Sequence, residues 1–183
     1  MIKRRFWQRW CGRMIGCLAV LAGCTPSGQG LPPLQSVARV DLPRYVGTWY
    51  EIASYPHRFQ RGCVASRAEY ALRDDGQVSV RNECRQGSLD GPFKSVEGRA
   101  RVVDPVSNAR LAVTFFWPFW GDYWIIDLDP DYQWAVVGHP SRNYLWILSR
   151  SRSLDEALYQ RIVAGLPARG YDPLRLQRTL QLQ

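Results

Sequence analysis

The sequence has few of the residues from which most enzyme and metal sites are built. It contains only two histidines, His57 and His139, and each lies next to a proline at the end of a predicted strand. It has no glycine-rich phosphate loop, no cluster of metal-ligand residues in the predicted domain and no Gly-x-Ser-x-Gly motif. We therefore expect no catalytic residue, no cofactor and no metal, and we interpret both histidines as loop residues.

The sequence also lacks a strong charge outside its first residues. The formal net charge is +8, from 24 basic and 16 acidic residues. Five of the basic residues lie in an amino-terminal segment without acids: Lys3, Arg4, Arg5, Arg9 and Arg13. Without them 19 basic and 16 acidic residues leave +3, which is too little to indicate a nucleic-acid partner.

With 183 residues and 46% hydrophobic content, the chain can bury one sizeable core, so we expect one domain.

The amino-terminal segment predicts export. The five basic residues precede an apolar run at residues 14–22, which is too short to cross a bilayer comfortably. This order is typical of a secretory signal peptide, which we place at residues 1–23. A retained membrane anchor is the alternative, and the short run argues against it.

A possible lipidation site follows the signal. Leu21-Ala22-Gly23-Cys24 resembles a bacterial lipobox, in which the cysteine becomes the lipidated first residue of the mature protein. Acyl chains on Cys24 would hold the protein at a membrane, because each buried methylene contributes about 0.8 kcal/mol. Thr25 replaces the aspartate that would resemble an inner-membrane retention signal, so the sequence favours the periplasmic face of the outer membrane. Residues 24–40, rich in Pro, Gly, Ser and Gln, predict a flexible tether.

The rest of the chain alternates strand-like runs with turn residues. Regular turns such as Asp74-Asp75-Gly76 and Asp129-Pro130 favour an up-and-down meander. Eight strands of this kind can close around one small ligand. The sequence therefore predicts an all-β fold, an eight-stranded antiparallel up-and-down β-barrel. The predicted strands are residues 48–55, 64–73, 77–84, 94–104, 109–117, 122–128, 132–137 and 144–150.

One helix and a final short strand are expected after the barrel. Ser153-Leu154-Asp155-Glu156 has the form of a capping box, and Leu154, Leu158 and Ile162 then recur every four residues until Gly165 and Pro167. So narrow an apolar stripe indicates a helix packed on the barrel wall. Residues 174–182 alternate Leu with Arg or Gln, which predicts an extra strand beside the first.

Three ordered segments resemble the signatures of the lipocalins. Gly47-Thr48-Trp49 is similar to the Gly-x-Trp of their first strand, and Leu128-Asp129-Pro130-Asp131-Tyr132 more loosely resembles their second motif. Leu145-Trp146-Ile147-Leu148-Ser149-Arg150 resembles the third. The resemblance covers residues 41–183, the predicted lipocalin domain, and is to the bacterial outer-membrane lipocalins related to apolipoprotein D. It implies that Arg150 packs over Trp49 to close the barrel floor.

Two of the five cysteines remain for a disulfide. Cys11 and Cys17 leave with the signal and Cys24 takes the lipid, so Cys63 and Cys84 meet an oxidising compartment. They flank a predicted hairpin, residues 65–83, which brings its ends together, and we expect them to pair. The alternative is a reactive Cys63, as in the one lipocalin branch that resembles an isomerase, and this needs an unpaired Cys84.

The most unusual stretch is residues 115–124, because hairpin loops are normally polar and this one carries large apolar rings. Pro118 and Gly121 mark its turn, where the rings would line a cavity mouth, touch lipid, enter a homodimer interface or fold over their own core. We rank the cavity mouth first. Glu51 shares the strand face of Trp49, so inside the barrel it would require a partner such as Arg99 or Arg101. The alternative is that such an arginine meets the carboxylate or phosphate of a ligand. The candidate ligand-binding residues are Trp117, Phe119, Trp120, Tyr123 and Trp146.

Apolar walls with few polar groups select elongated hydrophobic molecules, so a fatty acid or lysophospholipid is the expected ligand. The sequence therefore predicts an outer-membrane-anchored lipocalin that binds and carries or stores such lipids, without chemistry of its own and without a nucleic-acid partner. Two alternatives stay open. One is an enzyme acting on a bound lipid, and the other is a structural envelope lipoprotein whose barrel is filled by side chains.

Overall fold

The computed structural model describes residues 31–182. The predicted signal peptide and the Cys24 lipidation site lie outside the described residues.

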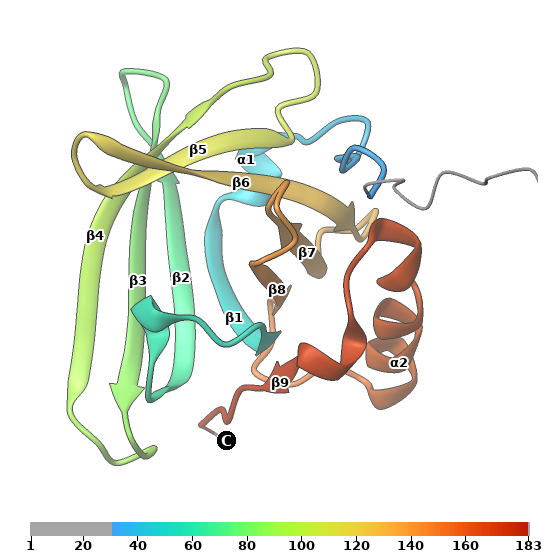
Figure 1. Cartoon of the computed structure of the whole chain (residues 1–183). Helices are drawn as coiled ribbons and strands as arrows, with labels where there is room; N and C mark the ends of the chain where they lie inside the picture. The colour runs from blue at the N-terminus through green and yellow to red at the C-terminus, as the bar shows by residue number, and fades with distance from the viewer. Residues whose placement is uncertain (1–30, 183) are drawn as a thin grey trace, which may run out of the picture. The chain divides into compact units, whose positions relative to one another are not determined.

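Nine strands form one antiparallel sheet, and eight of them close into a barrel (Figure 1). Neighbours in the chain from β2 to β8 pair in order, β8 pairs with β1, and β1 pairs with β2. The predicted eight-stranded up-and-down barrel is confirmed. The strands are β1 Gly47–Ser54, β2 Cys63–Leu72, β3 Val78–Gln86, β4 Phe93–Val102, β5 Arg110–Phe116, β6 Phe119–Leu128, β7 Trp134–Gly138 and β8 Leu145–Ser149.

This topology gives the barrel two unlike ends. The connections β1–β2, β3–β4, β5–β6 and β7–β8 lie at one end, which we call the mouth. The connections β2–β3, β4–β5 and β6–β7 lie at the other end, which we call the floor, together with the short helix α1 (Leu42–Tyr45) that precedes β1.

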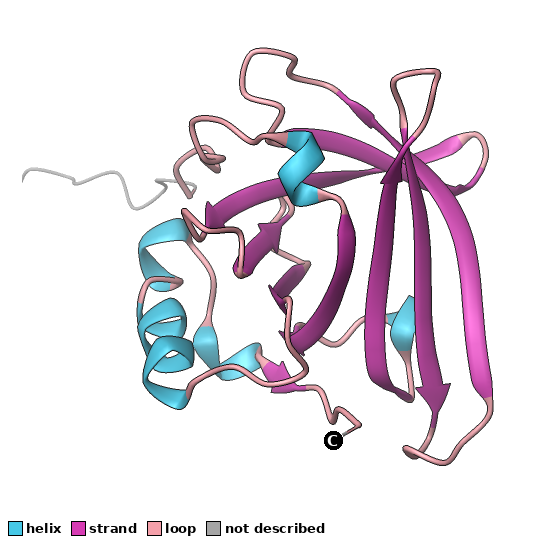
Figure 2. Cartoon of the chain, turned by 180° about the vertical axis from the view of Figure 1, so that it is seen from behind, coloured by secondary structure: helices cyan, strands magenta, loops and turns pink. Residues whose placement is uncertain are grey.

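Alternating side chains build two apolar layers. Trp49, Tyr70 and Val137 belong to the layer inside the barrel. Ile52, Val136 and Ile147 belong to a second layer outside the wall, packed against α2 (Glu156–Ala164). Figures 1 and 2 show α2 beside β7 and β8, away from β2–β4. The helix on the wall is therefore confirmed.

The predicted capping box starts two residues too early. The N-cap is Asp155, whose carboxylate accepts a hydrogen bond from the amide of Leu158, and not Ser153. Aspartate is as good an N-cap as serine, so the local pattern alone does not choose between the two. The helix ends at Gly165, as predicted.

The carboxyl-terminal tail closes a seam in the barrel. β9 (Gln177–Arg178) pairs with β1, which confirms the predicted ninth strand. β1 and β2 pair directly only at four positions, from Gly47 to Tyr50. Beyond them the tail lies between the two strands, because Thr179 donates from its amide to the Ile52 carbonyl and the Leu180 carbonyl accepts from the Ala65 amide.

The tether predicted from composition is wrong for residues 31–40. Leu34 and Val40 are fully buried, and the amides of Val37 and Val40 donate to the carbonyls of Ile125 and Ser107. Three apolar side chains spaced three apart, at 34, 37 and 40, give this segment a packing face that its proline and serine content hides.

The disulfide Cys63–Cys84 is confirmed, with 5.5 Å between the two Cα atoms. It links the mouth ends of β2 and β3 beside a register shift between Val64 and Arg67. The pairing leaves Cys63 without the free thiol that a reactive cysteine needs.

Candidate ligand-binding site

The floor is closed by the predicted pair of Trp49 and Arg150. The Trp49 side chain is completely buried, and the Arg150 guanidinium lies 3.8 Å from its ring centroid. Trp49 donates from its indole to the Tyr45 carbonyl at 2.7 Å. Gly47 has φ +99°, and a Cβ there would lie 3.2 Å from an Arg150 nitrogen, so the glycine of the motif makes room for the arginine. Arg150 also donates to the carbonyls of Arg44, Tyr45, Val46, Thr48 and Tyr132.

The residues of the second motif hold the floor connection in place. The Tyr132 hydroxyl accepts from the Asp41 amide at 2.9 Å, and the Arg44 guanidinium lies 4.2 Å from the Tyr132 ring centroid. The Asp129 carboxylate accepts from the Gln133 amide at 3.1 Å. Both motif residues therefore stabilise the floor and lie far from the mouth.

Three tyrosine hydroxyls form a chain inside the barrel near the floor. The hydroxyls of Tyr45 and Tyr123 are 2.7 Å apart, and Tyr123 donates to Tyr70 at 3.2 Å. Burial raises the pKa of Tyr70 to about 12 and raises those of Tyr45 and Tyr123 well above the ordinary value. All three are therefore neutral near pH 7. Tyr123, a predicted ligand residue, lies in this chain.

Towards the mouth the interior side chains become accessible. Val113, Phe115 and Trp146 pack against the interior layer and are only half-buried, whereas Trp49 near the floor is fully buried. Val96 on β4 shares the face of Ala100 and is 39% exposed. Apolar side chains that face the interior are therefore partly accessible towards the mouth, and Trp146, one of the predicted ligand residues, is among them.

Glu51 lies inside the barrel, as its strand face predicts, but the expected arginine partners are wrong. Its carboxylate accepts from the Ser54 hydroxyl, the Gln60 amide and the Thr179 hydroxyl. Arg99 and Arg101 lie on the opposite face of β4 from the buried Ala100, outside the barrel. Three hydrogen-bond donors thus replace a counterion for the buried carboxylate.

His57 belongs to a neutral network beside this carboxylate. Gln60 accepts through its side-chain oxygen from the Trp146 indole at 3.0 Å, and the same oxygen lies in hydrogen-bond contact with the His57 ring. The His57 ring packs edge-on against Tyr144 and Trp146. Burial lowers the pKa of His57, so its ring is neutral near pH 7.

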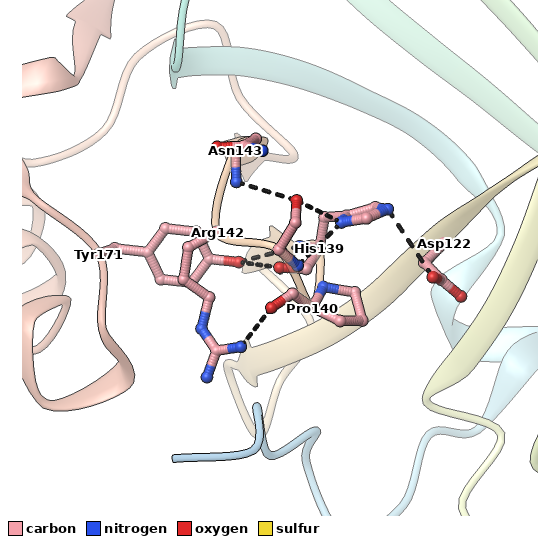
Figure 3. Close-up of polar contacts among 7 residues, drawn as sticks. Asp122, His139, Pro140, Arg142, Asn143 and Tyr171 are labelled. Carbon is pink, nitrogen blue, oxygen red and sulfur yellow. Dashed lines mark hydrogen bonds and ion pairs between the residues drawn. The ribbon is translucent and has the colours of Figure 1, made fainter. Parts of the chain in front are cut away.

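His139 follows β7 in the β7–β8 connection (Figure 3). The Tyr171 hydroxyl bonds both its amide and its carbonyl, at 2.9 and 3.0 Å. The His139 ring contacts the Ser141 hydroxyl and lies 3.7 Å from the Asp122 carboxylate. Both histidines therefore lie in mouth connections, as predicted.

The remaining predicted ligand residues lie at the tip of the β5–β6 hairpin. Trp117 and Phe119 are 76% and 77% exposed. Trp120 lies on the outer face, with its ring centroid 4.6 Å from the Arg101 guanidinium and 5.9 Å from that of Arg99. Ligand contact by these three rings stays a prediction.

Sequence reasoning missed several residues of the inner wall, namely Val96, Val113, Gln60 and Thr179. Alternation along β4 and β5 could have found the first two, since each shares a face with a small or apolar interior residue. Gln60 and Thr179 reach the site from segments without a periodic pattern, and no local signal marks them.

Within residues 31–182 no helix is long and apolar enough to cross a membrane, and no group of His, Cys, Asp and Glu side chains is arranged to hold a metal ion.

Comparison with known proteins assigns the chain to a family. A family model described as a lipocalin-like domain matches residues 40–181. The chain is 42% identical to temperature-induced lipocalin-1 of Arabidopsis thaliana over 157 residues, which cover 81% of this chain and 83% of that protein. It is 42% identical to outer membrane lipoprotein Blc of Escherichia coli over 136 residues, which cover 74% of this chain and 76% of that protein. It is 32% identical to apolipoprotein D of Cavia porcellus over 164 residues, which cover 79% of this chain and 82% of that protein.

Among solved structures, insecticyanin of Manduca sexta superposes with a TM-score of 0.67 at 22% identity, covering 84% of this chain and 87% of that one, which supports the fold. Lipocalins of this kind are typically binding proteins for small hydrophobic molecules. The sequence motifs, the closed barrel and the family match agree, and the chain belongs to the lipocalin family, in the group of Blc and apolipoprotein D.

Proposed function

We propose that the protein is an outer-membrane lipocalin that binds single-chain lipids in its barrel and carries or stores them in the cell envelope. Fatty acids and lysophospholipids are the proposed ligands. Acyl chains such as palmitate on Cys24 would anchor the protein at the periplasmic face. The name of the Escherichia coli relative, an outer membrane lipoprotein, supports this location.

The observation that carries this proposal is the change in exposure along the barrel interior. Near the floor Trp49, Tyr70 and Leu111 are buried, and towards the mouth Val96, Val113 and Phe115 are apolar and partly accessible. Micromolar binding corresponds to about 8 kcal/mol, which needs roughly 300 Å² of apolar burial at about 25 cal/mol per Å² before association costs. One long acyl chain supplies that area.

A fluorescent fatty acid, displaced by unlabelled palmitate, tests the proposal. Val113→Trp fills the inner wall and should weaken binding about ten-fold or more, since a buried ring takes space that the chain would occupy. The matched control is Val106→Trp, on the floor connection β4–β5, where the side chain is 84% exposed and binding should not change.

Equal binding by both variants would place the ligand outside the barrel. Native mass spectrometry of protein purified from membranes adds a second readout, because an intact lipid supports a carrier and a converted lipid supports an enzyme. A barrel that neither co-purifies with nor binds a lipid would favour the structural lipoprotein.

A further inference from the structure

The exposed aromatic residues of the described chain gather at one end of the barrel. Five phenylalanine and tryptophan side chains are more than half exposed, and all belong to mouth connections or to the strand ends beside them. They are Phe59 (66%), Phe93 (55%), Phe116 (70%), Trp117 (76%) and Phe119 (77%). We call these five residues the aromatic rim. Rings come from three separate connections, so one unusual loop does not account for them.

Charged residues are also distributed unequally between the mouth connections and the floor connections. The mouth connections, residues 55–62, 87–92, 117–118 and 139–144, carry three arginines and one aspartate, a net charge of +2, of which the buried Arg142 supplies one. The floor connections, residues 73–77, 103–109 and 129–133, carry one arginine and five aspartates, a net charge of −4. The barrel is therefore basic where its rings are exposed and acidic at the opposite end.

Cations lie directly beside the rim rings. The Arg58 guanidinium is 4.8 Å from the Phe59 ring centroid, and that of Arg85 is 5.6 Å from the Phe93 centroid. Aromatic rings favour the interfacial region of a bilayer, and arginines next to them can reach lipid phosphates. An anionic lipid surface complements both features, because it attracts basic residues and accepts apolar rings.

We propose that the aromatic rim docks the mouth of the barrel onto an anionic lipid surface. Trp117 and Phe119 enter the interfacial region, while Arg58 and Arg61 contact the phosphates. The acidic floor faces away from the membrane. In this orientation a single-chain lipid passes between the bilayer and the barrel interior without crossing water. This transfer of lipid rests on the proposed carrier function, whereas the docking itself does not.

The test uses full-length protein reconstituted in vesicles of phosphatidylcholine and phosphatidylglycerol in equal parts. Brominated phosphatidylcholine quenches tryptophans that touch lipid. The difference in emission between the wild type and Trp117→Phe isolates Trp117, because phenylalanine keeps the apolar ring and removes the reporter. We expect the Trp117 emission to shift to shorter wavelength and to lose most of its intensity to the brominated lipid.

Two variants provide controls. Val106→Trp, made in the Trp117→Phe background, places the reporter at the acidic floor, and its emission should stay unquenched. Arg58→Gln with Arg61→Gln should reduce the fraction of quenched Trp117 in anionic vesicles several-fold, since each cation contributes about a five-fold preference for an anionic surface.

A water-exposed, unquenched Trp117 in anionic vesicles would overturn the proposal. A blue shift without quenching, together with a dimeric mass in sedimentation, would also overturn it and would make the rim an interface between two copies of the chain. The fluorescent fatty-acid assay needs no vesicles, so docking and ligand binding fail or succeed separately.

Discussion

Tryptophans stand at both ends of the barrel, and their surroundings differ. Trp49 at the floor is completely buried, donates a hydrogen bond and lies under the Arg150 guanidinium. Trp117 at the mouth is 76% exposed. Burial of a satisfied ring stabilises the fold, whereas an exposed ring contributes nothing to the fold and is free to contact a ligand or a membrane. The same residue type therefore serves stability at one end and binding at the other.

The largest expected effect compares one substitution at the two ends. Trp49→Ala should lower the free energy of unfolding by about 3–5 kcal/mol, because it leaves a cavity and removes a buried ring. Trp117→Ala should change it by less than about 0.5 kcal/mol. Urea unfolding followed by circular dichroism measures both, and Trp49→Phe replaces the first variant if it does not fold. Equal losses would show that the Trp117 ring packs in a core.

A smaller effect compares a buried cation–π pair at the floor with an exposed pair on the outer wall. In a double-mutant cycle, Trp49→Leu and Arg150→Met should couple by about 1–2 kcal/mol, because the pair is desolvated. The outer-wall pair, in which the Trp120 ring centroid lies 4.6 Å from the Arg101 guanidinium, should couple by about 0.5–1 kcal/mol, as expected for an exposed site. Additive free energies at the floor would mean that the Arg150 contribution comes from its carbonyl contacts alone.

The floor could be predicted from the sequence because its parts carry a motif. Gly47, Trp49 and Arg150 stand in family order, and their contacts follow from the closure of the barrel. Strand positions followed from alternation, which depends only on neighbours in the chain. The disulfide followed from a hairpin that brings Cys63 and Cys84 together.

The mouth could not be predicted to the same depth. Register shifts between Glu51 and Ala53, and between Val113 and Phe116, break strict alternation. The first shift lets Ser54 reach the Glu51 carboxylate, although an odd number of residues along the strand should place the two side chains on opposite faces. Thr179 reaches the same carboxylate from the other end of the chain, and no spacing in the sequence reports that contact.

The smallest effect is the pH dependence that His57 gives the mouth. Burial holds the pKa of His57 below its ordinary value, and the Gln60 hydrogen bond and then the Glu51 carboxylate oppose this shift more weakly. The unfolded chain takes up a proton near its ordinary pKa of about 6.5, where the folded protein does not. Proton uptake by the unfolded chain therefore lowers the free energy of unfolding as the pH falls below about 6.5, and it has no effect above that pH. In this pH range the buried tyrosines of the floor add no pH dependence to stability, because they keep their protons until far higher pH. Urea unfolding at several pH values should give a shallower dependence of stability on pH for His57→Gln than for the wild type, because the two proteins differ in no other titratable group. Parallel slopes would mean that water reaches the His57 ring in the folded protein, and that the mouth is open at this point.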